Sequence, residues 1–228
     1  MENLLLLHGA IGAKDQLESL AERLSDKYTV HTFSFDGHGG MPFMAENFSI
    51  PLFAEEVLTY LNDNSISSVS IFGYSMGGYV AMYLARHQPT VIDRVITLAT
   101  KFEWNETIAA KEIKMLDADI IQEKLPAFAA QLAKRHSPND WKLVLEKTKN
   151  MMLQLGEKNA LLPEDYKLIA STCLLLLGEN DKMITKEETI AVQQALPHGE
   201  YRSLPGTPHP IEQVNMDILA SLITEFVS

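Results

Sequence analysis

The chain has 228 residues, of which 46% are hydrophobic and 21% charged, as expected for one soluble globular domain with a large core. Its formal net charge of -11, without a dense run of Lys and Arg, argues against nucleic acid or an anionic membrane surface as a partner. The single cysteine, Cys173, excludes an internal disulfide and lies in an apolar run where a buried thiol is expected.

The N-terminus begins with a short apolar run rather than a leader segment. Four leucines follow Met1-Glu2-Asn3 without a basic segment before them, and His8-Gly9 interrupts the run after residue 7. This stretch is too short for a signal peptide or a membrane span, so a cytoplasmic protein that does not insert into membranes is expected.

Strand-like and helix-like patterns then alternate along the first hundred residues. Hydrophobic periodicity predicts strands at residues 4–7, 28–35, 69–72 and 91–99, and helices at residues 15–24, 53–61 and 79–86. The second strand has the mixed pattern of a strand near a sheet edge. An uncovered edge can pair with another chain, so the protein is expected to be a monomer or a homodimer.

The alternation stops for about 65 residues and then resumes. Residues 105–169 show no convincing strand, only helical patterns interrupted by prolines and a glycine, and are predicted to form three or four helices. Further strands are predicted at residues 172–177 and 200–204, with helices at residues 185–195 and 216–226. The inserted helices can complete the core, cover an active site as a lid, or do both.

Strands alternating with helices imply crossover connections, hence a mostly parallel sheet with helices on both faces. The predicted fold class is therefore α/β, with about six strands. We expect residues 1–104 and 170–228 to form the core and residues 105–169 a helical lid insertion.

The strongest chemical signal is the sequence Gly73-Tyr74-Ser75-Met76-Gly77. It directly follows a predicted strand and directly precedes a predicted helix, the context in which G-x-S-x-G presents a nucleophile on a sharp turn. The glycines allow close packing around the turn. The helix N-terminus favours negative charge developing near Ser75. Ser75 is therefore the candidate nucleophile.

A serine hydroxyl needs a base that takes its proton. Of the seven histidines, His209 lies on the loop between the last predicted strand and the last helix, in Gly206-Thr207-Pro208-His209-Pro210. The flanking prolines restrict this loop. The other six occupy positions less suited to a base, within a strand, in glycine turns, near helix ends or before the last strand: His8, His31, His38, His87, His136 and His198.

The base needs an acid that holds its tautomer. Asp181 follows the preceding strand in Gly178-Glu179-Asn180-Asp181 and is the first choice. Glu179, two residues earlier, and Glu103, after the fourth strand, remain alternatives. The order Ser, Asp, His along the chain is the order of the α/β hydrolases.

The tetrahedral oxyanion of acyl transfer needs hydrogen-bond donors. The backbone N–H of Met76 is one candidate, because it follows the nucleophile. The loop after the first strand, His8-Gly9-Ala10-Ile11-Gly12, is expected to supply the other from Ala10, with Ile11 as the alternative. His8 itself is expected to have a structural role.

Together these residues resemble the α/β-hydrolase family over nearly the whole chain. The resemblance lies in His8-Gly9, Gly37-His38-Gly39, residues 73–77, residues 178–181 and Thr207-Pro208-His209. It implies a cofactor-free esterase, lipase, thioesterase or carbon–carbon bond hydrolase with Ser75, Asp181 and His209 as its triad. The β-hairpin with which the family usually begins is expected to be missing, because the first strand begins almost at Met1. Ser34 stands where the family often has an acid before the second glycine turn.

The sequence contains no metal-binding, nucleotide-binding or nicotinamide-binding motif, so no cofactor and no metal are expected. The expected substrate is a carboxylic ester or thioester of a small to medium apolar acyl group, cleaved through an acyl-enzyme. Acyl transfer, cofactor-free lyase chemistry and a catalytically silent binding protein remain alternatives. The residues expected to contact substrate are Ile11, Tyr74, Trp104, Met115 and Met151.

Overall fold

In the computed structural model, which describes residues 1–227, six strands form one parallel sheet. They are β1 (Glu2–Leu7), β2 (Tyr28–Thr32), β3 (Val69–Tyr74), β4 (Ile92–Leu98), β5 (Thr172–Gly178) and β6 (Gly199–Leu204). Their order is β2-β1-β3-β4-β5-β6, and every neighbouring pair is parallel. The predicted fold class is confirmed. Residue 228, which the sequence assigns to the core segment, lies outside the described residues.

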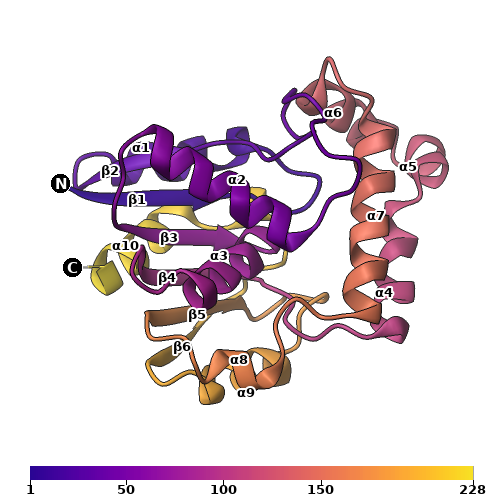
Figure 1. Cartoon of the computed structure of the whole chain (residues 1–228). Coiled ribbons are helices and arrows are strands. Elements are labelled where there is room, and N and C mark those ends of the chain that lie inside the picture. The colour runs from indigo at the N-terminus through magenta and orange to yellow at the C-terminus, as the bar shows by residue number, and fades with distance from the viewer. Residues whose placement is uncertain (228) are drawn as a thin grey trace.

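Ten α-helices connect or flank these strands within the described residues (Figure 1). Their bounds are α1 (Glu18–Leu24), α2 (Ile50–Asp63), α3 (Met76–His87), α4 (Glu106–Glu112), α5 (Ala118–Lys124), α6 (Pro126–His136), α7 (Trp141–Glu157), α8 (Pro163–Tyr166), α9 (Lys186–Ala195) and α10 (Met216–Val227). Short 3-10 helices cover Lys14–Leu17, Ile113–Leu116 and Ile211–Gln213.

The leucine run of β1 shows why the sheet is covered on both sides. Successive strand side chains point to opposite faces. Leu5 and Leu7 join a core with residues of α2, α3 and α9, whereas Leu4 and Leu6 join one with residues of α1 and α10. All four leucines are fully buried. A continuous apolar run in place of alternation is typical of a parallel strand between two helical layers.

The second strand is shorter than the sequence predicts. It ends at Thr32 rather than at residue 35, although its place at the sheet edge is confirmed. Phe35 leaves the sheet and donates its backbone N–H to Nε2 of His8, 3.2 Å away. The His8 side chain thus accepts a backbone N–H that would pair with a neighbouring strand if β2 continued through residues 33–35.

Five α-helices, α4 to α8, lie between β4 and β5, and no strand lies among them within the described residues. The sequence predicts the absence of a strand correctly, but its three or four helices are too few. In Figure 1, α4 to α7 stand beyond the carboxyl ends of the strands. They have a small core of their own, formed by Leu116, Ile121, Ala129, Leu132 and Leu145. The single turn α8 differs, because its Tyr166 packs into the core beneath α3 and α9.

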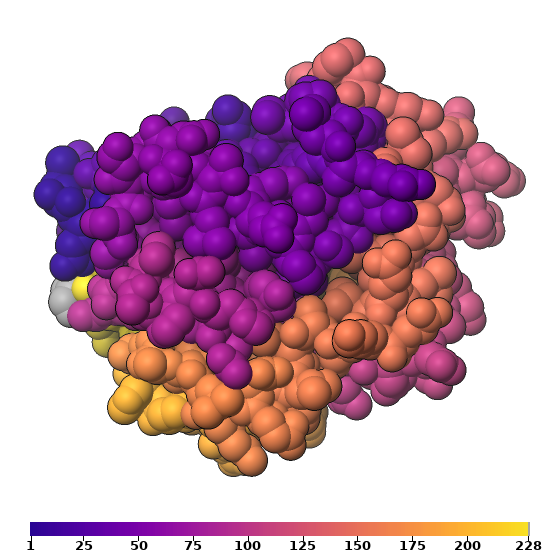
Figure 2. All heavy atoms as spheres, in the orientation of Figure 1, coloured from indigo at the N-terminus to yellow at the C-terminus, as the bar shows by residue number. Residues whose placement is uncertain are grey.

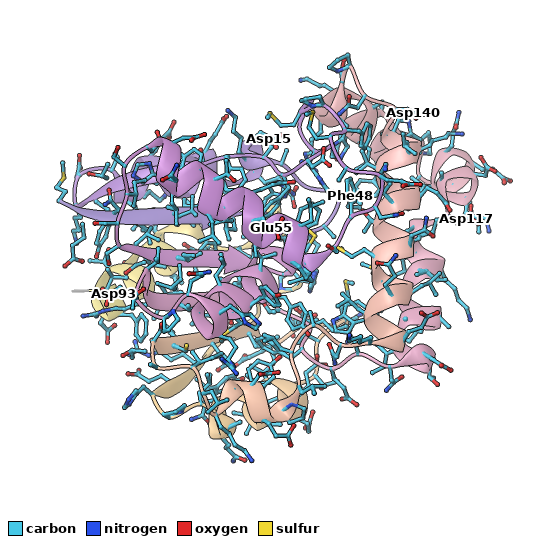
Figure 3. The ribbon with its side chains drawn as sticks, viewed as in Figure 1. Asp15, Phe48, Glu55, Asp93, Asp117 and Asp140 are labelled. Carbon is cyan, nitrogen blue, oxygen red and sulfur yellow. The ribbon has the colours of Figure 1, made fainter. Side chains whose placement is uncertain are left out.

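Local capping fixes the ends of the inserted helices. The carboxylate of Asp117 accepts backbone N–H groups at the start of α5, and that of Asp140 does the same for α7. Figure 3 shows both aspartates on the side of the insertion away from the sheet.

Polar contacts attach the insertion to the segment before α2. Asn139 donates to the carbonyl oxygens of Gly37 and Met41, at 3.0 and 2.5 Å. Lys147 donates to the carbonyl oxygens of Ala45 and Glu46. Figure 2 shows the insertion and the segment around residues 41–50 in contact on the visible face.

Candidate active site

Ser75 occupies a strained turn between β3 and α3. Its backbone has φ 52° and ψ -115°, a conformation that L-residues other than glycine seldom adopt. Surrounding hydrogen bonds hold it there, because its N–H donates to the carbonyl oxygen of Leu98 at 2.8 Å and its carbonyl accepts from Thr100 Oγ1 at 3.1 Å. The turn therefore has the strand-to-helix geometry that G-x-S-x-G predicts.

The glycines around Ser75 are required by close backbone approach. A Cβ on Gly73 would lie 2.4 Å from backbone atoms of Gly77 and Gly78. A Cβ on Gly77 would lie 2.5 Å from the carbonyl oxygen of Leu7 in β1. Non-bonded atoms do not approach a Cβ this closely, so any larger residue would displace the turn.

His209 and Asp181 are hydrogen-bonded across two loops. Nδ1 of His209 lies 2.8 Å from Oδ2 of Asp181, while Oδ1 accepts the backbone N–H groups of Met183 and Ile184 at 2.8 and 3.0 Å. Burial alone would raise the pKa of Asp181, but the hydrogen bond and charge attraction from His209, with these two N–H groups, lower it below its usual value. An ionised Asp181 leaves Nε2 of His209 free to accept a proton.

The alternative acids do not reach His209. Glu179 is exposed, and its carboxylate lies 3.4 Å from Ser203 Oγ and from the N–H of Gly206. Glu103 is exposed as well, and no hydrogen bond joins its carboxylate to another described residue. Asp181 alone of the three contacts the imidazole.

The loop after β1 forms a tight turn beside Ser75. The N–H of Gly12 donates to the carbonyl oxygen of Gly9 at 3.1 Å, and Ile11 has φ 53°. A positive φ at the third residue is typical of a type II turn, where glycine is usual and a branched residue is strained. Ala10 and Met76 both line the cavity that contains Ser75.

His8 has the structural role expected of it. Its Nδ1–H donates to the carbonyl oxygen of Gly9 at 2.8 Å, and its Nε2 accepts the N–H of Phe35. Burial is the main reason that its pKa falls to about 4, so the neutral ring is the stable form.

His136 is a residue that sequence reasoning treated only as a helix-end histidine. It is fully buried, and it donates from Nε2 to the carbonyl oxygen of Ile11 at 3.0 Å while Nδ1 accepts the N–H of Gly39 at 3.2 Å. It thus joins α6 of the insertion to the two glycine turns. Nothing local in the sequence around residue 136 signals these contacts.

Ser75 and His209 line the same cavity, which is narrow and partly open to solvent. Core and insertion both contribute to its wall. The other lining residues are Ala10, Ile50, Met76, Tyr79, Lys101, Trp104, Glu112, Met151, Met152, Leu155, Met183 and Ile184. Most of the wall is apolar, but Lys101 and Glu112 are ionisable groups that the sequence analysis did not anticipate.

The structure separates the five residues expected to contact substrate. Trp104 and Met151 line the cavity. Met115 does not, since it is 52% exposed on the insertion, so its expected role is not supported. Ile11 and Tyr74 also lie outside the lining. Tyr74 is buried, with its hydroxyl bonded to the backbone of His209. Ile11 packs against both the core that contains Leu5 and Leu7 and the small core of the insertion.

The described part of the chain has neither a helix that could span a membrane nor a cluster of side chains that could hold a metal ion. No helix within residues 1–227 is long and apolar enough to cross a membrane. In the same residues, no group of three or more His, Cys, Asp or Glu side chains could hold a metal ion.

The chain is similar to curated hydrolases. It is 21% identical over 243 residues to 2-(acetamidomethylene)succinate hydrolase of Mesorhizobium japonicum, covering 98% of this chain and 87% of that one. It is 29% identical over 135 residues to pimeloyl-[acyl-carrier protein] methyl ester esterase of Neisseria meningitidis, covering 59% and 50%. Three of the first four relatives are matched over only 30 to 50% of their own length.

Solved structures show the same fold at low sequence identity. MenH from S. aureus superposes with a TM-score of 0.79 at 23% identity, over 99% of this chain and 93% of that one. An esterase from Thermogutta terrifontis gives 0.75 at 22% identity, over 100% and 89%. The family model described as alpha/beta hydrolase fold matches residues 2–211. The chain therefore belongs to the α/β-hydrolase fold family.

Proposed function

We propose that this protein is a serine hydrolase that cleaves a carboxylic ester or thioester through an acyl-enzyme. The observation that carries the proposal is the shared position of Ser75 and His209 in one cavity, with His209 held by Asp181. A base oriented by a buried acid and facing the same space as a serine is the arrangement needed for nucleophilic catalysis.

In the first half-reaction, Ser75 Oγ attacks the carbonyl carbon and its proton passes to Nε2 of His209. The tetrahedral oxyanion is stabilised by the N–H groups of Met76 and Ala10. Its collapse breaks the bond to the alkoxide or thiolate, which leaves with the proton from His209. Water then attacks the acyl-enzyme, with His209 again taking a proton, and Ser75 is regenerated.

The strained turn and the helix support this assignment of the oxyanion donors. Met76 is the first residue of α3, so its N–H has no partner within the helix and lies at the positive end of the dipole. Ala10 lies in the turn that Gly9 and Gly12 close. Both residues border the cavity beside Ser75.

The insertion acts as the lid of this site in our proposal. Met151, Met152 and Leu155 of α7 face the same cavity as Ser75, so the inserted helices supply much of the apolar wall. An acyl chain of modest length would contact them after the ester carbonyl reaches Ser75. The names of two relatives, a pimeloyl-[acyl-carrier protein] methyl ester esterase and a diacylglycerol lipase, support an ester as the class of substrate.

The test is intact-mass analysis after treatment with a fluorophosphonate, for the native protein and for Ser75→Ala. One adduct on the native protein and none on the variant is expected, because only an activated serine reacts readily with this probe. Absence of an adduct on folded native protein, judged by circular dichroism, would contradict the proposal and favour a catalytically silent binding protein.

A further inference from the structure

Glu112 lies in the wall of the cavity, and its carboxylate has no protein partner among the described residues. It is the last residue of α4, it is 4% exposed, and it lines the same cavity as Ser75 and His209. Within residues 1–227, neither a hydrogen bond nor an ion pair joins its side chain to another residue. The carboxylate oxygens keep some accessible surface, so they face the open cavity and are available to a ligand.

Glu188 shows how the same fold satisfies a buried glutamate. It is 8% exposed, and its carboxylate accepts the N–H groups of Phe102 and Thr185 at 3.1 Å and lies 3.5 Å from Nζ of Lys101. Glu188 thus has a complete set of partners. Glu112 has none of these, although it is at least as buried.

The charges around the cavity favour a cation over an anion. Lys101 supplies the one positive side chain in the wall, and its ammonium is already paired with Glu188. Glu112 remains unpaired, and the carboxylate of Asp181 lies directly behind His209. A carboxylate on the substrate would meet this excess of negative charge, whereas an ammonium would neutralise it.

The apolar wall can accommodate a hydrocarbon chain that carries the ammonium group. Met151 and Leu155 of α7 are buried and border the cavity together with Glu112. Methylene groups can pack on these side chains while a charged end reaches Glu112. An ester with an apolar chain and a terminal amine matches both features.

We propose that Glu112 recognises an ammonium group of the substrate, so that the cavity selects esters whose bound chain ends in a primary amine. The substrate preference rests on the proposed hydrolase function, but recognition by Glu112 can be measured without catalysis. Glu112 is in this proposal a specificity-determining residue and takes no part in bond breaking.

The kinetic test compares p-nitrophenyl esters that differ only at the chain end. The pairs are 6-aminohexanoate with heptanoate and 8-aminooctanoate with nonanoate, in which ammonium replaces methyl. For each pair, the measured quantity is kcat/KM for the amino ester divided by kcat/KM for the methyl ester. In Glu112→Gln this ratio is expected to fall at least tenfold for one of the two chain lengths, because a charge-assisted hydrogen bond is lost. An unchanged ratio at both lengths would overturn the proposal.

Glu106→Gln is the matched control for this change. Glu106 begins the same helix, is exposed, and does not line the cavity. The same removal of one negative charge from α4 should leave the ratio unaltered. A fall as large as that of Glu112→Gln would indicate a long-range charge effect and overturn the assignment to Glu112.

A binding measurement separates this proposal from the hydrolase function. Calorimetric titration of Ser75→Ala with heptylammonium should show binding that is at least tenfold weaker when Glu112→Gln is added. Ammonium binding without ester hydrolysis or fluorophosphonate labelling would refute the hydrolase and keep the Glu112 site. If the native protein hydrolyses the heptanoate ester but Glu112→Gln does not change the affinity for heptylammonium, the hydrolase proposal stands and the proposed role of Glu112 is refuted.

Discussion

The hydroxyl of Tyr74 donates a hydrogen bond to the backbone carbonyl oxygen of His209 at 3.0 Å, and the two rings lie 5.7 Å apart. This contact joins the residue before the candidate nucleophile to the loop that carries the candidate base. Burial is the main reason that the pKa of Tyr74 is raised, so the hydroxyl remains a donor at neutral pH. Tyr74 thus positions a loop, in place of the substrate contact expected from the sequence.

Tyr74→Phe should lower kcat/KM on an aryl ester several-fold, because His209 loses one constraint on its position. Loss of this hydrogen bond should also cost about 1 kcal/mol, or roughly 2–4 °C in Tm for a chain of this size. Tyr83→Phe is the control, since its hydroxyl bonds to no described residue. Equal effects of the two variants on rate would argue against a positioning role for Tyr74.

Asp181→Asn should reduce kcat by about a thousand- to ten-thousand-fold, by the precedent of serine protease triads. An amide can donate to Nδ1 of His209, which places the imidazole proton on Nε2, where the base must be free. Steady-state kinetics on p-nitrophenyl acetate would measure the effect. The control is Glu179→Gln, two residues away, because its carboxylate contacts Ser203 and Gly206. If Glu179→Gln were the more damaging change, Glu179 would replace Asp181 as the acid.

Met151→Ala should shift the preference of the enzyme toward longer or bulkier acyl chains. Met151 is 3% exposed and lines the cavity that contains Ser75, so its truncation to alanine should enlarge the cavity. The measurement is kcat/KM across p-nitrophenyl esters from acetate to octanoate. Met115 lies on the exposed side of the insertion, so Met115→Ala should give the same chain-length profile as the native protein. Identical profiles for all three proteins would exclude α7 from the acyl pocket.

The free energy of unfolding should fall in mild acid because of His8. Its pKa is about 4 in the folded protein and 6.5 when solvated, so between these values the unfolded chain binds more protons and stability decreases as pH falls. The loss from His8 alone is on the order of 3 kcal/mol, complete near pH 4. Burial lowers the pKa of His38 and His136 as well, which adds to the effect.

Glu56 has the opposite effect on the free energy of unfolding, so its contribution must be eliminated by substitution. Burial raises its pKa to about 7, so the folded protein binds more protons than the unfolded chain between pH 4.5 and 7, and stability from Glu56 increases as pH falls. Urea titrations of Glu56→Gln at several pH values would isolate the histidines. A flat profile between pH 6.5 and 4 would contradict the assigned neutral state of His8.

Much of the architecture follows from local patterns. The leucines of β1 and β5 predict strands buried on both faces, and G-x-S-x-G between a strand and a helix predicts a sharp turn at Ser75, as found. Asp181 and His209 follow from their place after the last two strands, because parallel strands bring their carboxyl ends to one edge. The largest error at a strand end concerns β2, which stops three residues early because His8 takes the place of a strand partner, whereas the ends of β1, β3, β4, β5 and β6 differ from the prediction by one or two residues.

The sequence by itself determined the strand and helix succession, the fold class and the residues that lie at the carboxyl edge of the sheet. These depend on periodicity and turn chemistry within short segments. Tertiary structure alone decided that Tyr74 holds the His209 loop, that His136 joins the insertion to two turns, and that Glu112 is buried unpaired while Met115 is exposed. Such features depend on which distant segments pack together, and helical periodicity in the insertion does not specify which face of each helix meets the cavity.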